Sequence, residues 1–366
     1  MMMSNYGGQQ LLVIDCCYCQ TQIPLVSPIS VLCRRCGRCT RVASPGFPRS
    51  PYSAVPYYVR INRPPHAGFP HRLPGPPPKV HRRKKAVICG ISYLHTRGEL
   101  NGCINDAKLM RSLLISKFNF AEDSIIMLTE KETDPYKIPY KRNIEGALRW
   151  LVRGCQPGDS LLFYFSGHGS QLREQYRGDE LDGKDETLCP LDFKTKGMIR
   201  DDWINATIVG PIPRDVKLHA IVDSCSSGTI LDLPWLCNMD RDGSCKWDKA
   251  SGVWKGASGG EVICISGCHD NQTSAETQSI PTTGVMTFCF IQAIKSGQAA
   301  TYGSLLNSMR SAIRSMGSAA GGSGGAVTSL AGMLLAGGRV GGGGLRQEPQ
   351  LTAGTRFDVY TKPFTL

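Results

Sequence analysis

The sequence lacks several features whose absence narrows the class of protein. No stretch approaches the ~18 to 20 uninterrupted apolar residues that cross a bilayer, so we expect no membrane segment. Residues 1–10 have neither the basic nor the apolar region of a secretory signal. We therefore expect a reducing compartment, with the 16 cysteines serving as metal ligands, nucleophiles or core residues. Acidic residues are nearly missing from residues 1–85, which carry 13 Lys and Arg against Asp15 alone, while the remainder holds 29 of each sign.

Two stretches, residues 161–170 and 218–228, share a pattern that indicates a reactive site. Each is an apolar run of strand length that ends in a tip of small and polar residues. The first tip places His168 between two glycines, and the second presents Cys225 ahead of two serines and a glycine. If the strands are neighbours in a parallel sheet, the imidazole and the thiol meet at its carboxyl edge as a nucleophile pair. The alternative is an inert cysteine that fills space at a strand end.

Apolar runs alternate with helical patterns along residues 85–366, which predicts βαβ units and a mostly parallel sheet. We expect strands at residues 85–92, 124–128, 161–166, 218–223, 261–266 and 357–360. We expect helices at residues 107–118, 143–152, 286–295 and 302–316. Residues 317–344 are rich in Gly, Ser and Ala, and we expect them to form a flexible excursion.

The N-terminal segment contains two CxxC pairs, Cys16 with Cys19 and Cys33 with Cys36. This spacing is typical of a tetrahedral zinc site, although a redox dithiol or free thiols remain alternatives. Two further cysteines, Cys17 and Cys39, compete for the same role. Residues 41–84 are rich in proline and end in a basic cluster, which predicts a disordered linker. The alternative for this basic cluster is a role in nuclear import or nucleic-acid binding.

Ser166-Gly-His-Gly169 and Asp223-Ser-Cys-Ser-Ser-Gly228 resemble the two signatures of the metacaspases, which are caspase-like cysteine proteases. The cysteine pairs resemble the small zinc finger at the front of plant type I metacaspases. The resemblance implies a caspase-like three-layer α/β sandwich, preceded by a zinc finger and a Pro-rich linker. It divides the chain into a finger (1–40), a linker (41–84) and a peptidase domain (85–366), the last comprising residues 85–235, a connecting loop 236–259 and residues 260–366. Ser226, where the family often has His, and the Gly-rich excursion depart from the pattern.

The charge near the predicted nucleophile indicates a basic substrate. Asp223 lies two residues before Cys225 and so on the same face of the strand, while Asp106 is expected in the first strand-to-helix loop. Carboxylates beside a nucleophile favour a cationic side chain over an anionic one. The resemblance implies a pocket for substrate Arg or Lys formed by Cys103, Asp106, Ser166 and Asp223. For Asp106, the alternative is a charge that satisfies helix N-terminal amides.

A second acidic set lies between and after the two predicted catalytic strands. Converging carboxylates are what Ca²⁺ requires, but the spacing is not that of an EF-hand loop, so a solvated acidic loop is the alternative. The resemblance implies calcium ligands at Asp185, Asp201, Asp202 and Asp232. Glu186 and Asp192 are expected to be structural or to lie beside the pocket.

Together these features predict a calcium-dependent cysteine endopeptidase that cleaves after Arg or Lys and is made as a self-processing zymogen. The resemblance suggests a role in regulated cell death, stress or defence. We expect self-cleavage near residues 82–85 or 246–255, because their basic residues look exposed. The expected protein is a cytoplasmic monomer, with the nucleus as an alternative location. We expect it to bind protein substrates, and protein partners through its finger, but neither nucleic acid nor membrane. The alternative is a catalytically silent zinc-finger scaffold that regulates partners by binding.

Overall fold

The chain forms two compact units, Met1–His71 and Arg72–Leu366, which we describe separately. The computed structural model describes residues 84–174, 183–225, 228–240, 242–250, 255–267, 283–319 and 348–366, and the backbone of five short N-terminal strands. In the first unit, β1 (Met3–Tyr6), β2 (Gln9–Asp15) and β3 (Gln22–Pro24) form an antiparallel sheet, and β4 (Ser30–Leu32) pairs with β5 (Cys39–Arg41). The four cysteines predicted to bind zinc, Cys16, Cys19, Cys33 and Cys36, lie outside the described residues, as does most of the predicted linker.

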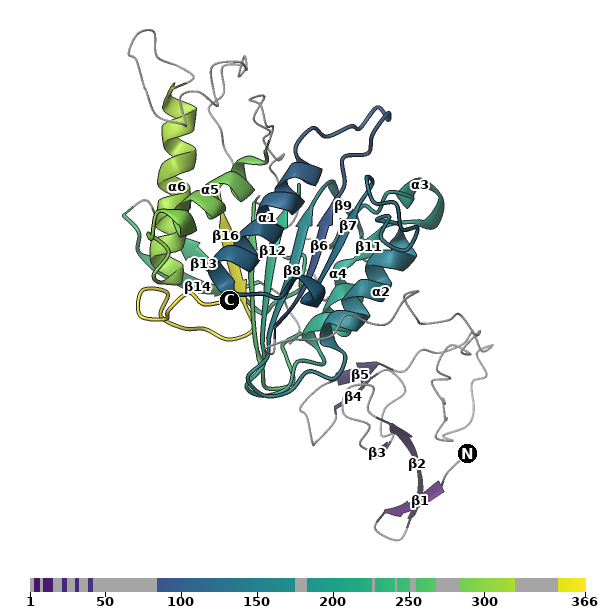
Figure 1. The fold of residues 1–366 in the computed structure, drawn as a ribbon. Coiled ribbons are helices and arrows are strands. Elements are labelled where there is room, and N and C mark those ends of the chain that lie inside the picture. The colour runs from purple at the N-terminus through teal and green to yellow at the C-terminus, as the bar shows by residue number, and fades with distance from the viewer. Residues whose placement is uncertain are drawn as a thin grey trace. The chain divides into compact units, whose positions relative to one another are not determined.

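An eight-stranded sheet forms the centre of the second unit (Figure 1). Its order is β14-β13-β16-β15-β12-β8-β6-β7, and the five strands from β15 to β7 run parallel. The parallel strands are β6 (Lys84–Gly90), β7 (Ile125–Thr129), β8 (Ser160–Ser166), β12 (Lys217–Asp223) and β15 (Glu261–Ser266). The antiparallel edge consists of β13 (Trp235–Met239), β14 (Cys245–Lys249) and β16 (Gln350–Ala353). The prediction of a mostly parallel sheet is therefore confirmed.

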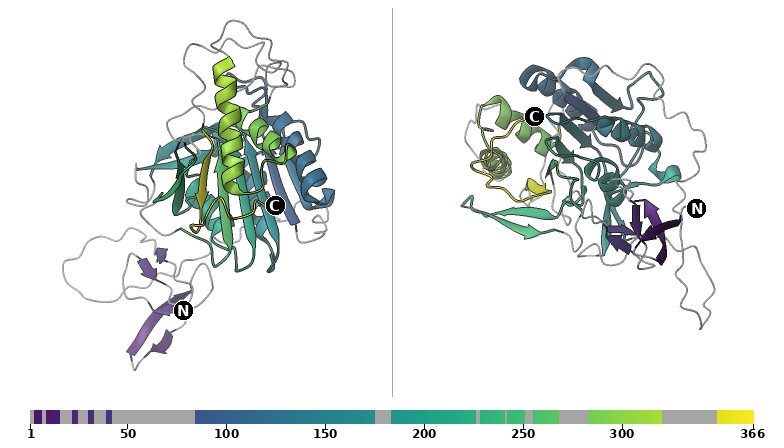
Figure 2. Two further views of the ribbon diagram at one scale, coloured as in Figure 1. Left: turned by 90° about the vertical axis from the view of Figure 1, so that its left-hand side faces the viewer. Right: turned by 90° about the horizontal axis from the view of Figure 1, so that it is seen from below.

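Alternation along the strands divides their side chains between two hydrophobic cores. In β8, Leu162 and Tyr164 belong to one core, and Leu161, Phe163 and Phe165 belong to the other. The first core is closed by α1 (Cys103–Phe118), α5 (Val285–Lys295) and α6 (Tyr302–Ala319). The second is closed by α2 (Lys141–Val152), α4 (Asp201–Ile204) and the π-helix η2 (Asn205–Val209). Helices therefore cover both faces of the sheet (Figure 2). The result is the three-layer α/β sandwich that the sequence predicts.

A second, smaller sheet stands beside the carboxyl edge of the large one. It pairs β9 (Gly169–Arg173), β10 (Lys184–Leu188) and β11 (Ile199–Arg200) in antiparallel fashion, and β9 begins directly after His168. The short helices η1 (Glu122–Ser124) and α3 (Phe193–Lys196) complete the unit. The sequence reading did not predict this sheet, because its strands are short and carry charged residues.

The prediction of a strand at residues 357–360 is wrong. Residues 357–360 form a turn, and the strand that completes this part of the sheet is β16, seven residues earlier. All four residues of β16 are buried, although Gln350 and Thr352 are polar, so hydrophobicity alone does not reveal it. The aromatic ring of Phe357 instead packs against Trp247 and Tyr302, with ring centroids 5.2 and 5.1 Å apart.

The hairpin of β13 and β14 carries the disulfide Cys237–Cys245, with Cα atoms 6.2 Å apart. The expectation that the cysteines are thiols is therefore wrong for this pair. Among the described residues, seven other cysteines are not part of a disulfide, namely Cys89, Cys103, Cys155, Cys189, Cys225, Cys264 and Cys289. Within the described part of the chain, no helix is long and apolar enough to span a bilayer.

Candidate functional site

The two predicted catalytic tips lie against each other at the carboxyl edge of the sheet. Strands β8 and β12 are parallel neighbours, with Ser166 in register with Asp223, so His168 and Cys225 each follow two residues later. The backbones touch beyond the strands. A Cβ atom on Gly169 would overlap the carbonyl oxygen of Cys225 and lie 3.0 Å from Ser224 Oγ, so only glycine permits this approach. The prediction that the tips meet at one edge is confirmed by the strand register.

The imidazole of His168 is held by two groups that the sequence reading missed. Its Nε2 lies 2.7 Å from the carbonyl oxygen of Gly98, and its backbone N–H donates to Tyr93 Oη at 2.9 Å. The Tyr93 ring lies 4.6 Å from the imidazole, and its hydroxyl donates to the carbonyl of Cys189 at 2.6 Å. Because a carbonyl oxygen can only accept, Nε2 carries the ring proton. The lone pair is then on Nδ1, the nitrogen that can take a proton from a thiol.

Tyr93 and Gly98 were predictable in part. They follow β6, which is the parallel neighbour of β8 on the side away from β12, so their segment leaves the sheet at the same carboxyl edge. The order of the strands would have indicated them, because residues that follow a parallel strand next to β8 leave the sheet at the same edge as His168 and are candidates for contact with it.

Cys225 is half-buried, whereas the nearby Cys189 is buried. Burial, together with the nearby Cys225, raises the pKa of the Cys189 thiol to about 11. Cys189 therefore remains protonated at neutral pH and is a poor nucleophile.

The predicted substrate pocket is assembled from three elements of the first core. Asp106 and Cys103 lie in the first turn of α1, which begins four residues before the predicted start, and Ser166 and Asp223 end β8 and β12. All four are buried. Ser166 Oγ donates to Asp106 Oδ2 at 3.1 Å, so the α1 turn and the β8 end are directly linked.

Asp106 and Asp223 also converge on the start of α5. The N–H of Gly284 donates to both oxygens of Asp106 at 3.1 and 3.0 Å, and the N–H of Thr287 donates to Asp223 Oδ2 at 3.0 Å. A Cβ atom built on Gly284 would overlap Asp223 Oδ2 and lie 3.0 Å from Asp106 Oδ2, so the two carboxylates flank a single point. These donors are uncharged, and they leave the negative charge of each carboxylate in place. Both the pocket reading and the amide-cap reading of Asp106 therefore have support.

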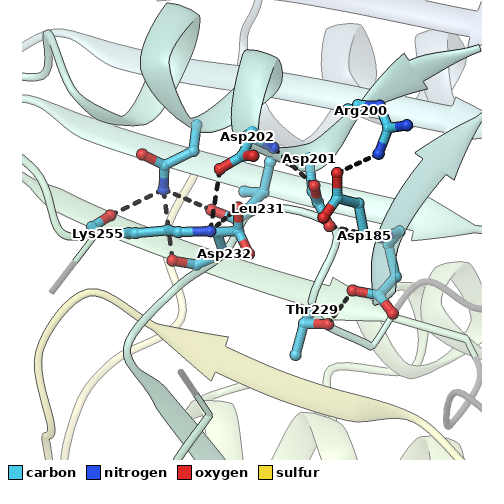
Figure 3. A network of polar contacts seen from close by, with 10 residues as sticks. Asp185, Arg200, Asp201, Asp202, Thr229, Leu231, Asp232 and Lys255 are labelled. Atoms are coloured by element: carbon cyan, nitrogen blue, oxygen red, sulfur yellow. Dashed lines mark hydrogen bonds and ion pairs between the residues drawn. The ribbon is translucent and has the colours of Figure 1, made fainter. Parts of the chain in front are cut away.

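Three residues of the predicted calcium set form one cluster. Asp185 of β10 and Asp201 and Asp202 of α4 each offer a carboxylate oxygen, all within 4.8 Å of one another. Asp201 also accepts from the N–H groups of Glu186 and Asp202, at 2.5 and 2.7 Å. Arg200 pairs with Asp185 on the outer side (Figure 3).

Asp232 joins the cluster through a lysine. Lys255 Nζ lies 3.0 Å from Asp202 Oδ1 and 2.9 Å from Asp232 Oδ2, and its side chain is only 11% exposed (Figure 3). The second oxygen of Asp202 is buried and has no hydrogen-bond partner among the described residues. Asp232 itself adopts a left-handed backbone conformation with φ of 51°. Lys255 was expected to lie in an exposed loop, and this expectation is wrong.

Two other lysines expected to be exposed are also anchored. Lys84 and Lys85 belong to β6, and their ammonium groups donate to carbonyl oxygens of Phe118 and Leu366, and of Arg153. By contrast, Lys246 and Lys249 are exposed on the edge strand β14, while Arg82 and Arg83 lie outside the described residues.

The other two acidic residues considered from the sequence are structural. Glu186 is buried and accepts from Thr229 and from Gln171, the latter at 3.2 Å. Asp192 accepts from the N–H of Lys141 at 2.8 Å, which satisfies the first amide of α2.

Comparison with known proteins identifies the family. Residues 84–234, which include His168 and Cys225, match the model of the metacaspase, peptidase C14 domain. The chain is 58% identical to Metacaspase-1 of Arabidopsis thaliana over 365 residues, covering 97% of this chain and 96% of that protein. It is 51% identical to Metacaspase-2 of the same plant, covering 79% and 74%, and 35% identical to Metacaspase-1 of Mycosarcoma maydis, covering 64% and 68%. With this fold and these relatives, the chain belongs to the metacaspase family of caspase-like cysteine proteases.

Proposed function

We propose that this chain is a calcium-dependent cysteine endopeptidase that cleaves peptide bonds after Arg or Lys. The observation that supports this most directly is the shared edge of the sheet. The ends of β8 and β12 bring a thiol and an imidazole with its Nδ1 lone pair available to one edge of the sheet. Two buried carboxylates belong to the same edge, Asp223 at the end of β12 and Asp106 of α1, which is bonded to Ser166 at the end of β8. A nucleophile pair and an anionic pocket on adjacent strands suit cleavage beside a basic side chain.

In the proposed reaction, His168 Nδ1 takes the proton of the Cys225 thiol, and the thiolate attacks the carbonyl carbon of the substrate. The imidazolium then protonates the leaving amine as the C–N bond breaks, which leaves a thioester on Cys225. Water, deprotonated by the same imidazole, hydrolyses the thioester and restores the thiol. Throughout, the Gly98 carbonyl keeps the Nε2 proton in place and so fixes the tautomer and the orientation of the ring.

Substrate selection is assigned to Asp106 and Asp223. A guanidinium or ammonium group between them would meet two carboxylates already ordered by Ser166, Gly284 and Thr287. An aspartate side chain would meet like charge in a buried site, where water does little to screen it.

We assign the calcium site to Asp185, Asp201, Asp202 and Asp232. The donor set fits a hard divalent cation, because three carboxylates converge within 4.8 Å and Asp202 keeps a buried oxygen without a hydrogen bond among the described residues. When bound, calcium would supply positive charge that joins β10 and α4 to the segment after Cys225. In the same way, we retain zinc at Cys16, Cys19, Cys33 and Cys36 as a proposal for the N-terminal unit.

The zymogen proposal now favours the β14 region. Lys246 and Lys249 are exposed there, whereas Lys84, Lys85 and Lys255 are held by carbonyl or carboxylate groups. A role in regulated cell death, stress or defence is proposed from the family alone.

The test compares fluorogenic peptides that carry Arg, Lys or Asp before the cleaved bond, with calcium and with a chelator. Cleavage of the Arg and Lys peptides alone, only with calcium, is expected from the wild type, and none from Cys225→Ala. Calcium-independent activity would refute the cofactor, equal turnover of the Asp peptide would refute the pocket, and activity of Cys225→Ala would refute the nucleophile.

A further inference from the structure

The first turn of α5 carries groups that touch the proposed substrate pocket but lie more than sixty residues beyond Asp223 in the chain. Helix α5 begins after Gly284, and Phe288 N–H donates back to the Gly284 carbonyl at 2.9 Å. The N–H groups of the first turn have no partner inside a helix, and the helix dipole makes this end positive. Here those groups hold the carboxylates of Asp106 and Asp223.

Thr287 makes two hydrogen bonds to the same oxygen of Asp223. Its N–H lies 3.0 Å from Oδ2 and its hydroxyl lies 2.7 Å from Oδ2. A third bond joins the Thr287 hydroxyl to the hydroxyl of Tyr164, at 2.8 Å, and Tyr164 is fully buried. Thr287 of α5, which is itself bonded to Tyr164 of β8, therefore contributes to the orientation of Asp223.

The direction of these bonds follows from their chemistry. An ionised carboxylate can only accept, so the single hydroxyl proton of Thr287 points to Asp223. Thr287 Oγ1 must then accept from Tyr164, whose hydroxyl keeps its proton, because burial and the charges of Asp106 and Asp223 raise its pKa well above the usual value. The chain Tyr164 to Thr287 to Asp223 thus delivers a donor to the carboxylate and favours its charged form.

We propose that Thr287 is a positioning residue for substrate specificity, which holds Asp223 ionised and aimed so that a basic side chain can bind between Asp223 and Asp106. The inference rests on the proposed function, since it concerns the same pocket. Gly284 contributes by having no side chain, because a Cβ there would overlap Asp223 Oδ2. The competing explanation is that Asp223 merely caps α5 and stabilises the fold.

The test uses Thr287→Val, which keeps the shape of the side chain and removes the hydroxyl, with Thr287→Ser as the matched control that restores the donor. Loss of a hydrogen bond to a charged group corresponds to a roughly 10- to 100-fold change in a binding constant. We expect kcat/KM for Arg and Lys peptides to fall by that factor in Thr287→Val, mainly through KM, and to recover to within about threefold in Thr287→Ser. Iodoacetamide does not use the acidic pocket, so the rate at which it alkylates Cys225 should not change.

The pH profile separates positioning from capping. The hydroxyl donor favours the charged carboxylate of Asp223, so its removal should move the acid limb of kcat/KM for the Arg peptide to higher pH in Thr287→Val. The titratable groups around Asp223, namely Asp106 on α1, Tyr164 on β8 and Cys289 on α5, are unchanged in both variants.

Two results would overturn the inference while leaving the proposed function intact. One is a Thr287→Val protein whose KM and acid limb equal those of Thr287→Ser. The other is a parallel loss of peptide cleavage, Cys225 alkylation and thermal stability with an unmoved acid limb, which is the signature of a fold defect. If the wild type itself failed to distinguish Arg from Asp peptides, the proposed function would fail first.

Discussion

Replacement of Lys255 by methionine tests whether a cationic side chain occupies part of the proposed calcium site. In the wild type, one ammonium contacts Asp202 and Asp232, at 3.0 and 2.9 Å, and the side chain of Asp232 is fully buried. Methionine keeps most of the volume and removes the charge. Both carboxylates then lose a partner in a site with little water, and a divalent cation no longer has to displace the lysine.

The expected magnitudes follow from that burial. Breaking a buried ion pair by removing one partner costs ~3–5 kcal/mol. With an unfolding entropy of ~2.1 cal/mol/K per residue, a unit of this size shifts its melting temperature by about 1.5–2 °C per kcal/mol, so in chelator the variant should melt roughly 5–10 °C below the wild type. Two opposite unit charges 3 Å apart in an effective dielectric of 20 attract each other by about 5–6 kcal/mol, and the cost of removing both charges from water offsets most of this energy. A remainder of about 1.4–2.8 kcal/mol corresponds to calcium affinity ~10- to 100-fold higher in the variant.

Both quantities should be measured in a Cys225→Ala background, which prevents self-cleavage. Isothermal titration calorimetry gives the calcium Kd, and differential scanning calorimetry gives the melting temperature in chelator and in calcium. Lys246→Met is the matched control, because Lys246 is 79% exposed and its ion pair with Asp248 contributes little. A calcium Kd for Lys255→Met equal to that of the control would refute the idea that lysine and calcium share Asp202 and Asp232.

Three further outcomes are expected. His168→Ala should lower kcat/KM for the Arg peptide by ~10²- to 10⁴-fold without changing the circular dichroism spectrum, and near-wild-type turnover would remove His168 from the mechanism. Burial, with nearby Lys217 and Lys362, lowers the pKa of His219 to about 3, so the unfolded chain binds a proton below about pH 6.5 that the folded chain does not. Stability should therefore fall as the pH drops from about 6.5 towards 3, and His219→Gln should flatten that slope in urea titrations. Finally, the full chain under reducing conditions should contain one zinc ion, and the double variant Cys16→Ser/Cys33→Ser should lack it, as measured by inductively coupled plasma mass spectrometry.

The sequence was sufficient to predict the parts of the site that local patterns encode. Apolar runs of strand length located β8 and β12, and their glycine-containing tips located His168 and Cys225. Period-two alternation also predicted that Asp223 lies on the same face of the strand as Cys225, and in the structure its carboxylate accepts from Thr287 of α5. Each of these inferences needs only neighbours in the chain and the rule that parallel strands end at one edge.

The parts that the sequence did not predict depend on contacts between distant segments. Thr287 is 64 positions from Asp223, and the Gly98 carbonyl is 70 positions from the imidazole that it orients. A backbone carbonyl carries no sequence signal, and a threonine in a helix is unremarkable until its partner is known. Lys255 was misread for the same reason, because a lysine in a Gly-containing stretch is normally solvated, and here it is held by the buried carboxylate of Asp232 and the half-buried carboxylate of Asp202.

The order of the strands at the antiparallel edge determines what a cut between residues 246 and 255 would produce. The piece before the cut contributes β12 and β13, and the piece after it contributes β15 and β16. In the sheet, β16 and β15 of the later piece lie side by side between β13 and β12 of the earlier piece, since β13 pairs with β16, β16 with β15, and β15 with β12. The two pieces are therefore interleaved, and neither can leave without breaking two strand interfaces. A nicked molecule would remain a single particle under native conditions and resolve into two chains only in denaturant, so loss of a fragment is not the way in which cleavage there could change activity.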